Sequence, residues 1–420
     1  MLNTISGIFN IRDLRNKLLF TIAMLVVIRL GVFIPVAGVD TAKLASVFGQ
    51  GNLLGFLDMF TGGALARFSI FAMGIVPYIN ASIILQLLTA VIPQLEELNK
   101  EGEAGRKQIA QYTRYLMVAL AMFEAMGMAF WLRGVILPGV SFPFFLVSCV
   151  VALTAGSTLV MWIGELITEN GIGNGASLII FVGIVARVPT YISNTITLLK
   201  GGASFIGVIV LLAVLVAMII AIVIVQEAQR RIQVQYAKRI VGRRVYGGQS
   251  TYIPLRINQG GVIPIIFASS ILLFPATIAQ FIPLSFMQSI SNFLMPGRAP
   301  YMLLYFCLIF FFTYFYTAIT FNPNDLAENI QKYGGFIMGI RPGRATAEYL
   351  EGVITKLTFV GALFLAVVAI VPTIVEGMTH ITSFQGLGST ALLIVVGVAL
   401  DLVRQIETHL IARQYEGLLA

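Results

Sequence analysis

The sequence predicts an all-α polytopic membrane protein with ten transmembrane helices in two inverted five-helix halves. Of its 420 residues, 58% are hydrophobic and only 11% are charged, whereas a soluble domain carries about 25% charged residues. A twelve-residue segment marked by glycine and proline occurs twice, and most basic residues fall on one side of the predicted spans. These three observations predict, in turn, the membrane-protein class, the inverted repeat and the orientation of the chain in the membrane.

The predicted spans are apolar runs about as long as a helix that crosses a ~30 Å hydrocarbon core. Two runs, 203–225 and 299–321, contain no charged residue at all. The first run is longer than the apolar core of a secretory leader and no A-x-A-like site follows it, so we expect it to be retained. The spans are expected near 18–38, 70–92, 114–133, 143–166, 174–196, 203–225, 261–282, 301–321, 355–374 and 387–404.

The repeated segment runs from Gly74 to Leu85 and again from Gly261 to Leu272, with Gly, Pro, Ala-Ser and Ile-Leu at matching positions. Taken singly, Pro77 and Pro264 could simply start helices, where a missing N–H costs least. A Gly/Pro-marked apolar segment at corresponding places in two halves is instead typical of inverted-repeat membrane proteins, whose functional site lies between the halves. The matched pair therefore favours a repeat.

Each half carries five spans, and the division falls around Gly201–Gly202. We expect an N-terminal half over 1–200 and a C-terminal half over 201–420. With a cytoplasmic N-terminus, 20 of the 27 basic residues lie on the cytoplasmic side. The positive-inside rule then puts both termini in the cytoplasm, and the twin segments cross the membrane in opposite directions.

Two cytoplasmic loops are too long to be simple connectors, because long loops usually carry function. They lie near 226–260 and 322–354, and the polar run Gln226–Gly247 is expected to extend span six as a helix into the cytosol. Their basic surface could lie against anionic lipid, RNA phosphates or an acidic protein face. Composition does not separate these three partners.

The sequence lacks the motifs of common enzymes. There is no G-x-x-x-x-G-K-[ST], no H-E-x-x-H and no G-x-S-x-G, so neither an enzyme nor a cofactor is expected. The glycine-rich segment 169–175 joins two apolar spans and follows no strand, which favours a tight helical turn over a phosphate cradle. Cys149 and Cys307 fall in spans and are expected to be buried thiols, with no disulfide or metal.

Two rival functions lack the residues that they would need. A coupled carrier of small solutes would place several carboxylates at the midplane. Intramembrane ionisable residues are instead scarce, namely Arg29, Glu124 and Asp401, and of these only Glu124 is clearly mid-span. An intramembrane hydrolase would need a paired nucleophile and base. The only histidines, His380 and His409, are predicted on opposite sides of the membrane.

The midplane of the twin segments carries bulky aliphatic residues at helical spacing. Ile75 and Ile79 are four apart, as are Val262 and Ile266. Such pairs are usually ordinary helix packing. At a seam between halves, the same side chains would form an apolar constriction that blocks water and ions by dewetting. This constriction suits a conduit for something large, flexible and chemically varied.

An apolar stretch interrupted by glycines lies between spans one and two, over 56–67. It is either an ordinary exterior loop or a small re-entrant element in a protein-lined cavity, where irregular backbone is tolerated at membrane depth.

Six long stretches carry a resemblance to a known family. Over essentially its whole length the chain resembles the SecY family of protein-conducting channels. The resemblance implies a clamshell with an hourglass pore for unfolded polypeptides, and a lateral gate of spans two, three, seven and eight that releases apolar helices into lipid. The stretches are Asp58–Gln86, Lys100–Tyr115, Ile167–Gly175, Gln229–Ser250, Gly261–Thr277 and Phe321–Gly343.

The resemblance also implies site residues. Ala176 departs from the family pattern, which is larger at that place, so the pore seal is expected to be looser there. Gln86 and Asn258 match polar positions near the lateral gate. The pore ring is expected at Ile75, Ile79, Ala176, Ile180, Ile266 and Ile394, and the plug near 57–67 at Thr61, Gly62, Gly63, Ala64, Leu65, Ala66 and Arg67.

The cytoplasmic loops 227–260 and 323–354 resemble the docking surface for the ribosome, through its RNA phosphates, and for the motor ATPase SecA. SecE and SecG are the implied small membrane partners, unfolded precursors and signal sequences the cargo, and anionic lipid the surroundings. The implied location is a bacterial plasma membrane, although a thylakoid-type membrane also fits. Arg341 matches the position most sensitive for motor function. The docking residues are expected at Arg230, Arg231, Lys238, Arg239, Arg243, Arg244, Arg341 and Arg344.

Overall fold

The computed structural model describes residues 11–40, 43–44, 58, 61–202, 204–236, 239–241, 244–246, 250–281, 293, 298–379 and 389–419. Within this part every predicted span coincides with a helix, which confirms the predicted fold class. The spans correspond in order to α2 (Arg12–Gly31), α5 (Val76–Val91), α7 (Glu103–Trp131), α8 (Phe142–Asn170), α9 (Gly175–Val185) with α10 (Val188–Lys200), α11 (Phe205–Glu227), α12 (Ile263–Phe281), α14 (Ala299–Thr320), α16 (Arg344–Thr379) and α17 (Ser389–Leu419).

By length and hydropathy alone, fewer of these helices qualify as membrane-spanning. Six helices of the described chain are long and apolar enough to cross a membrane, and a seventh span results if the bent pair of α5 and α6 (Pro93–Lys100) is counted as one. The two helices of that pair meet at 99°. Pro93 at the start of α6 explains the bend, because a proline disfavours helical backbone at the residue before it.

Several predicted boundaries were wrong. Span one was expected to reach residue 38, but α2 ends at Gly31. Span two was expected from residue 70, but residues 61–75 are not helical and α5 begins at Val76. Span five was expected as one helix but is divided at Ala186–Arg187, and Pro189 is the second residue of α10. The segment 170–175 is the tight turn between α8 and α9 that its position between two apolar spans predicted.

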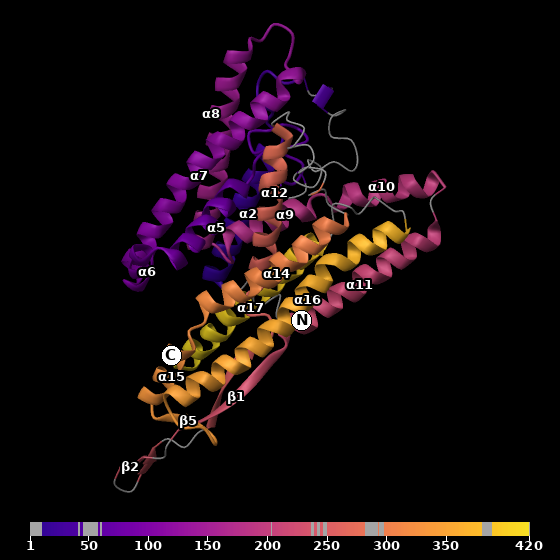
Figure 1. The fold of residues 1–420 in the computed structure, drawn as a ribbon. Coiled ribbons are helices and arrows are strands. Elements are labelled where there is room, and N and C mark those ends of the chain that lie inside the picture. The colour runs from indigo at the N-terminus through magenta and orange to yellow at the C-terminus, as the bar shows by residue number, and fades with distance from the viewer. Residues whose placement is uncertain are drawn as a thin grey trace.

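In Figure 1, α7 and α8 of the first half lie on one side and α11, α14 and α16 of the second half on the other, while α12 lies beside α2, α5 and α9 of the first half. The two halves meet where α12 contacts both α5 and α7, and where α17 contacts α9. The shared apolar core includes Ile75 from the first half, and Ile266 and Ile394 from the second. Cys149 is buried as expected, whereas the expectation was wrong for Cys307, which is exposed on α14.

The twin segments adopt the same local structure. Gly74 and Gly261 both have positive φ, 55° and 59°, and each stands two residues before the first residue of its helix. Glycine is favoured there because a side chain is strained in the left-handed region. Pro77 and Pro264 are the second residues of α5 and α12, and these two helices contact each other at the interface.

The cytoplasmic extension expected as a helix is instead a small β-sheet. Helix α11 ends at Glu227, and the strand β1 (Gln229–Tyr236) follows it directly. Strand β1 pairs antiparallel with β4 (Ser250–Arg256) on one side and with β5 (Gly335–Ile337) on the other. A separate short hairpin, β2 (Arg239–Val241) with β3 (Arg244–Tyr246), lies between β1 and β4 in the chain.

The physical reason is an alternation of period two. Ile232 and Val234 are buried, while Arg231 and Gln233 between and beside them are exposed, the pattern of a half-buried strand. The buried face packs against α15 (Pro323–Lys332) and α16 through a separate apolar cluster of Ile232, Val234, Leu255, Ile330, Ile337, Leu350 and Ile354.

Candidate functional site

A cavity of about 730 Å³ is lined by residues of both halves. Its wall is polar and carries both signs of charge. Its apolar lining includes five of the six predicted ring residues, which α5, α9 and α12 bring together from distant parts of the chain. These five, which we call the cavity floor, are Ile75, Ile79, Ala176, Ile180 and Ile266.

The sixth predicted ring residue lies elsewhere. Ile394 is fully buried on α17, and it does not contribute to the lining of this cavity within the described chain. Its place in the shared core behind the floor is consistent with packing, since α17 contacts both α9 and α12.

The place of Ala176 follows from a close contact between α8 and α9. A Cβ atom on Gly175 would stand 1.9 Å from the carbonyl oxygen of Gly164, so only glycine permits this approach. Thr168 accepts a hydrogen bond from the Gly175 N–H at 2.9 Å, and Asn174 caps α9 by accepting from Ser177 N at 3.1 Å. These contacts fix the start of α9 beside the cavity.

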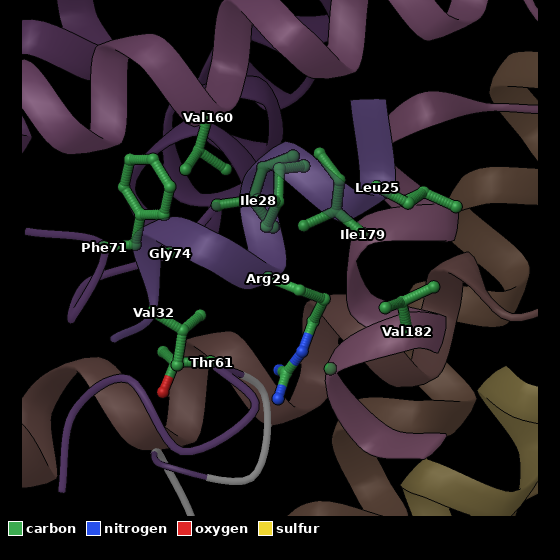
Figure 2. Close-up of a pocket in the computed structure, with 12 residues that line it drawn as sticks. Leu25, Ile28, Arg29, Val32, Thr61, Phe71, Gly74, Val160, Ile179 and Val182 are labelled. Atoms are coloured by element: carbon green, nitrogen blue, oxygen red, sulfur yellow. The ribbon is translucent and has the colours of Figure 1, made fainter. Parts of the chain in front are cut away.

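A second cavity of about 20 Å³ lies on the side of the predicted plug (Figure 2). It is lined by α2, α8 and α9 and by the segment that precedes α5, including Arg29 and Thr61. Ile75 lines both cavities. Ile75 therefore stands between the large cavity and a small space that residues of the first half alone enclose.

The predicted plug residues Thr61–Arg67 form consecutive turns held by Asp58. The Asp58 backbone oxygen accepts hydrogen bonds from the Thr61 hydroxyl and the Gly63 N–H, each at 3.1 Å. Its carboxylate Oδ1 accepts from the Ala66 N–H at 2.8 Å. Ala64 and Leu65 are buried, so the plug segment is packed into the molecule.

Two arginines of the N-terminal half that lie outside the plug segment bind it. Arg29 of α2 donates from Nη1 to the Gly62 carbonyl oxygen at 3.1 Å, and its guanidinium extends toward the plug side of the small cavity in Figure 2. Arg187, at the junction of α9 and α10, forms an ion pair with Asp58 Oδ2. Neither Asp58 nor Arg187 was singled out from the sequence, although a lone carboxylate beside an apolar stretch was a usable signal.

The predicted gate residues do not come together. Gln86 is exposed on α5, lines the large cavity and donates to the Ser82 hydroxyl at 3.3 Å. Asn258 is buried before α12 and donates from Nδ2 to the Gly261 carbonyl oxygen at 2.9 Å. The predicted gate helices are nevertheless in contact: α12 packs on both α5 and α7, and Phe267 meets Phe312 of α14 edge to face.

The two loops predicted to be cytoplasmic form one surface, because β1 of the first pairs with β5 of the second. Arg230, Arg231, Arg341 and Arg344 are exposed on it. The Arg231 guanidinium lies over the ring of Tyr252, 4.8 Å from the centroid. Arg239 and Arg244 belong to the hairpin β2–β3, and Lys238 and Arg243 lie outside the described residues.

Comparison with known proteins agrees with this architecture. A family model described as SecY matches residues 69–403. The protein translocase subunit SecY of Synechococcus elongatus is 51% identical over 416 residues, which cover 96% of this chain and 94% of that protein. The protein of the same name from Escherichia coli K12 is 48% identical over 421 residues, covering 97% and 94%.

Solved structures agree in fold at low sequence identity. One described as "The structure of a protein conducting channel" matches with a TM-score of 0.66 and 18% identity, over 94% of this chain and 92% of that one. "Sec61 in the Canine ribosome-channel complex from the endoplasmic reticulum" matches with a TM-score of 0.63 and 17% identity, over 94% and 92%. With a family model that matches most of the chain and relatives near half identity over nearly its full length, the chain belongs to the SecY family.

Proposed function

We propose that the chain is the central subunit of a protein-conducting channel, which passes unfolded polypeptides across a membrane and releases apolar helices sideways into lipid. The observation that carries this proposal is the cavity floor, where aliphatic side chains from both halves converge below a wide polar space. The names of the relatives support the same activity.

The chemistry of the cavity suits a varied cargo. Its wall combines Arg106, Lys107 and Arg114 with Glu103 and Glu165, so a passing chain meets both signs of charge and no single strong field. Arg114 and Glu165 are already paired, at 2.9 Å. The floor offers no polar ligand for an ion, and an apolar constriction excludes water and ions by dewetting when empty. Around an extended polypeptide the same side chains would act as a gasket.

Release of apolar helices would use the contact between α12 and the pair α5–α7. This seam lies in the shared apolar core, which includes Ile83 of α5 and Ile266 of α12, and lipid or an apolar segment can replace such packing without leaving hydrogen bonds broken. Gln86 and Asn258 would tune how readily the seam opens. Their separate hydrogen bonds leave each half able to move without breaking a bond between them.

The energy for movement would come from outside the chain, from a translating ribosome or a SecA-type ATPase docked on the β-sheet surface. The exposed arginines of that surface suit RNA phosphates or an acidic protein face. SecE and SecG would be the small membrane partners. The excess of basic residues on this side favours a cytoplasmic location of both termini, in a bacterial plasma membrane.

Crosslinking tests the proposal directly. A photoreactive residue at Ile79 or Ile266, in vesicles that contain the assembled channel, should capture a precursor stalled halfway through translocation. The same probe at Ile209, which is exposed on the apolar face of α11, is the matched control and should capture lipid instead. Capture of the precursor at Ile209 but not at the floor positions would refute a path between the halves.

A further inference from the structure

Asp58 uses its two carboxylate oxygens for different partners. One oxygen accepts from the Ala66 N–H and so shapes the plug segment. The other binds the guanidinium of Arg187. The Asp58 side chain is only 2% exposed and that of Arg187 23% exposed. Because this pair is largely shielded from water, it is screened less than a surface pair.

We propose that the Asp58–Arg187 ion pair is the latch that holds the plug segment on the closed pore, and that a moving α9 opens it. This inference rests on the proposed function. It adds two positioning residues outside the cavity floor: Asp58 at the start of the plug segment, and Arg187 at the junction of α9 and α10.

The latch attaches the plug to one half of the molecule. Arg187 stands directly after α9, and Arg29, the second anchor, belongs to α2. Gly62 packs so closely on α9 that an added Cβ would lie 2.9 Å from the Cα of Gly183. These contacts are all with the N-terminal half, so separation of the halves alone would carry the plug along with α2 and α9.

The same helix connects the latch to the cavity floor. Helix α9 begins with Ala176 and Ile180 on the floor and ends at Val185, two residues before Arg187. Its eleven residues span about 16 Å, so one rigid element joins the constriction to the plug. A polypeptide that pushes α9 outward relative to α2 would therefore draw Arg187 away from Asp58, because Arg29 of α2 also holds the plug at Gly62.

Charge makes Asp58 difficult to replace. Arg29 lies within electrostatic reach of both Arg67 and Arg187, and Asp58 pairs with Arg187 of this group. Without its charge the arginines repel one another across the plug. An Asn at this place would keep an acceptor for the Ala66 N–H and remove only the charge, which separates the latch from the shape of the turn.

The test is a double-mutant cycle on the assembled channel in vesicles, read as resting ion leak. We expect Asp58→Asn and Arg187→Gln each to raise the leak by about tenfold, since a buried charge left without its partner strongly disfavours the closed state. The double variant should leak no more than either single one, and Arg187→Lys should leak much less than Arg187→Gln. Arg133→Gln, which removes an exposed arginine on the same predicted side, is the matched control.

A second readout reports the plug itself. Thr61→Cys in a Cys149→Ala/Cys307→Ser background should react slowly with a maleimide in the resting channel, and faster with a stalled precursor or with Asp58→Asn. An unchanged leak and unchanged labelling in Asp58→Asn would overturn the latch, as would fully multiplicative effects of the two single changes. Precursor transport by the unmodified channel is measured in parallel: its absence counts against the proposed function, whereas transport with an unaffected leak counts against the latch alone.

Discussion

Ile75 and Ile266 line the same cavity from opposite halves of the chain. Ile75 stands directly before α5 and Ile266 lies in the first turn of α12, and both are largely buried. Ile75 also faces the small cavity beside the plug segment. The two residues therefore mark where the halves meet at the cavity floor, and the small cavity beside the plug segment lies next to Ile75.

Shortening the floor side chains should open this point. Replacing Ile79 and Ile266 together with Gly removes two four-carbon side chains from the floor, and water can then enter a gap that was too apolar and too narrow to hold it. We expect a severalfold rise in resting ion leak, measured as conductance of vesicles that contain the assembled channel. Replacing Ile209 and Ile220 of α11 together with Gly carries the same helix penalty, about 1 kcal/mol per glycine, without touching the floor. Equal ion leak in the two preparations would contradict a sealing role of the floor side chains.

Deleting the plug segment Thr61–Arg67 should also raise the resting leak. The deletion removes the buried side chains of Ala64 and Leu65 and the group that accepts from Arg29. The backbone pairing of Pro35 with Ser69 lies outside the deleted residues, so the strand-like return to α5 can persist. Single-channel recording is the measurement, and a channel that stays as tight as the unmodified one would show that these turns do not block the pore.

The arrangement of the spans was predictable because it depends on hydropathy, which acts locally. The repeat was predictable too, because Gly74 and Gly261 stand where the backbone needs positive φ and the two prolines mark helix starts. Five floor residues followed from a family resemblance. The sixth, Ile394, shared their apolar character, but its helix places it in the core behind the floor.

What was missed depends on contacts between distant residues or on a weaker periodicity. The run of Gln and Arg after span six is rich in helix formers, and only the alternation at Ile232 and Val234 indicated a strand. Its partner β5 lies about a hundred residues along the chain and has no signal of its own. The pairing of Asp58 with Arg187 is likewise tertiary, so neither residue alone predicted it.

The docking surface makes a prediction about Arg341. Its exposed guanidinium follows β5 on the sheet that joins the two cytoplasmic loops. Replacing it with Glu reverses a charge on this surface without disturbing a buried group. We expect Arg341→Glu to reduce motor-driven export of a precursor severalfold while the amount of assembled channel in the membrane stays normal, as measured by transport into inverted vesicles and by immunoblotting.

Lys356→Glu is the matched comparison for that change. Lys356 is exposed on α16, outside the predicted docking loops, and carries the same charge. An equal loss of export in both variants would indicate a general electrostatic effect instead of a docking site at Arg341. Normal export by Arg341→Glu would rule out this residue as a contact for the motor.

A hydrogen bond inside the membrane region gives a prediction for stability. Asn80 of α5 donates from Nδ2 to Glu124 Oε1 of α7 at 3.3 Å, which links two helices of the predicted gate. Interhelical hydrogen bonds of this kind contribute on the order of 0.6–1.7 kcal/mol in membrane proteins. We therefore expect Glu124→Ala and Asn80→Ala each to lower the free energy of unfolding in detergent by about 1 kcal/mol.

The cycle of single and double variants separates this bond from simple loss of packing. If the bond stabilises the α5–α7 pair, the double variant loses less than the sum of the single losses, and Glu124→Gln, which keeps an acceptor for Asn80, stays near the unmodified protein. Strictly additive losses would mean that the two side chains act independently. Since lipid offers neither group another partner, additivity would also require that each finds a new hydrogen bond inside the bundle when the other is removed.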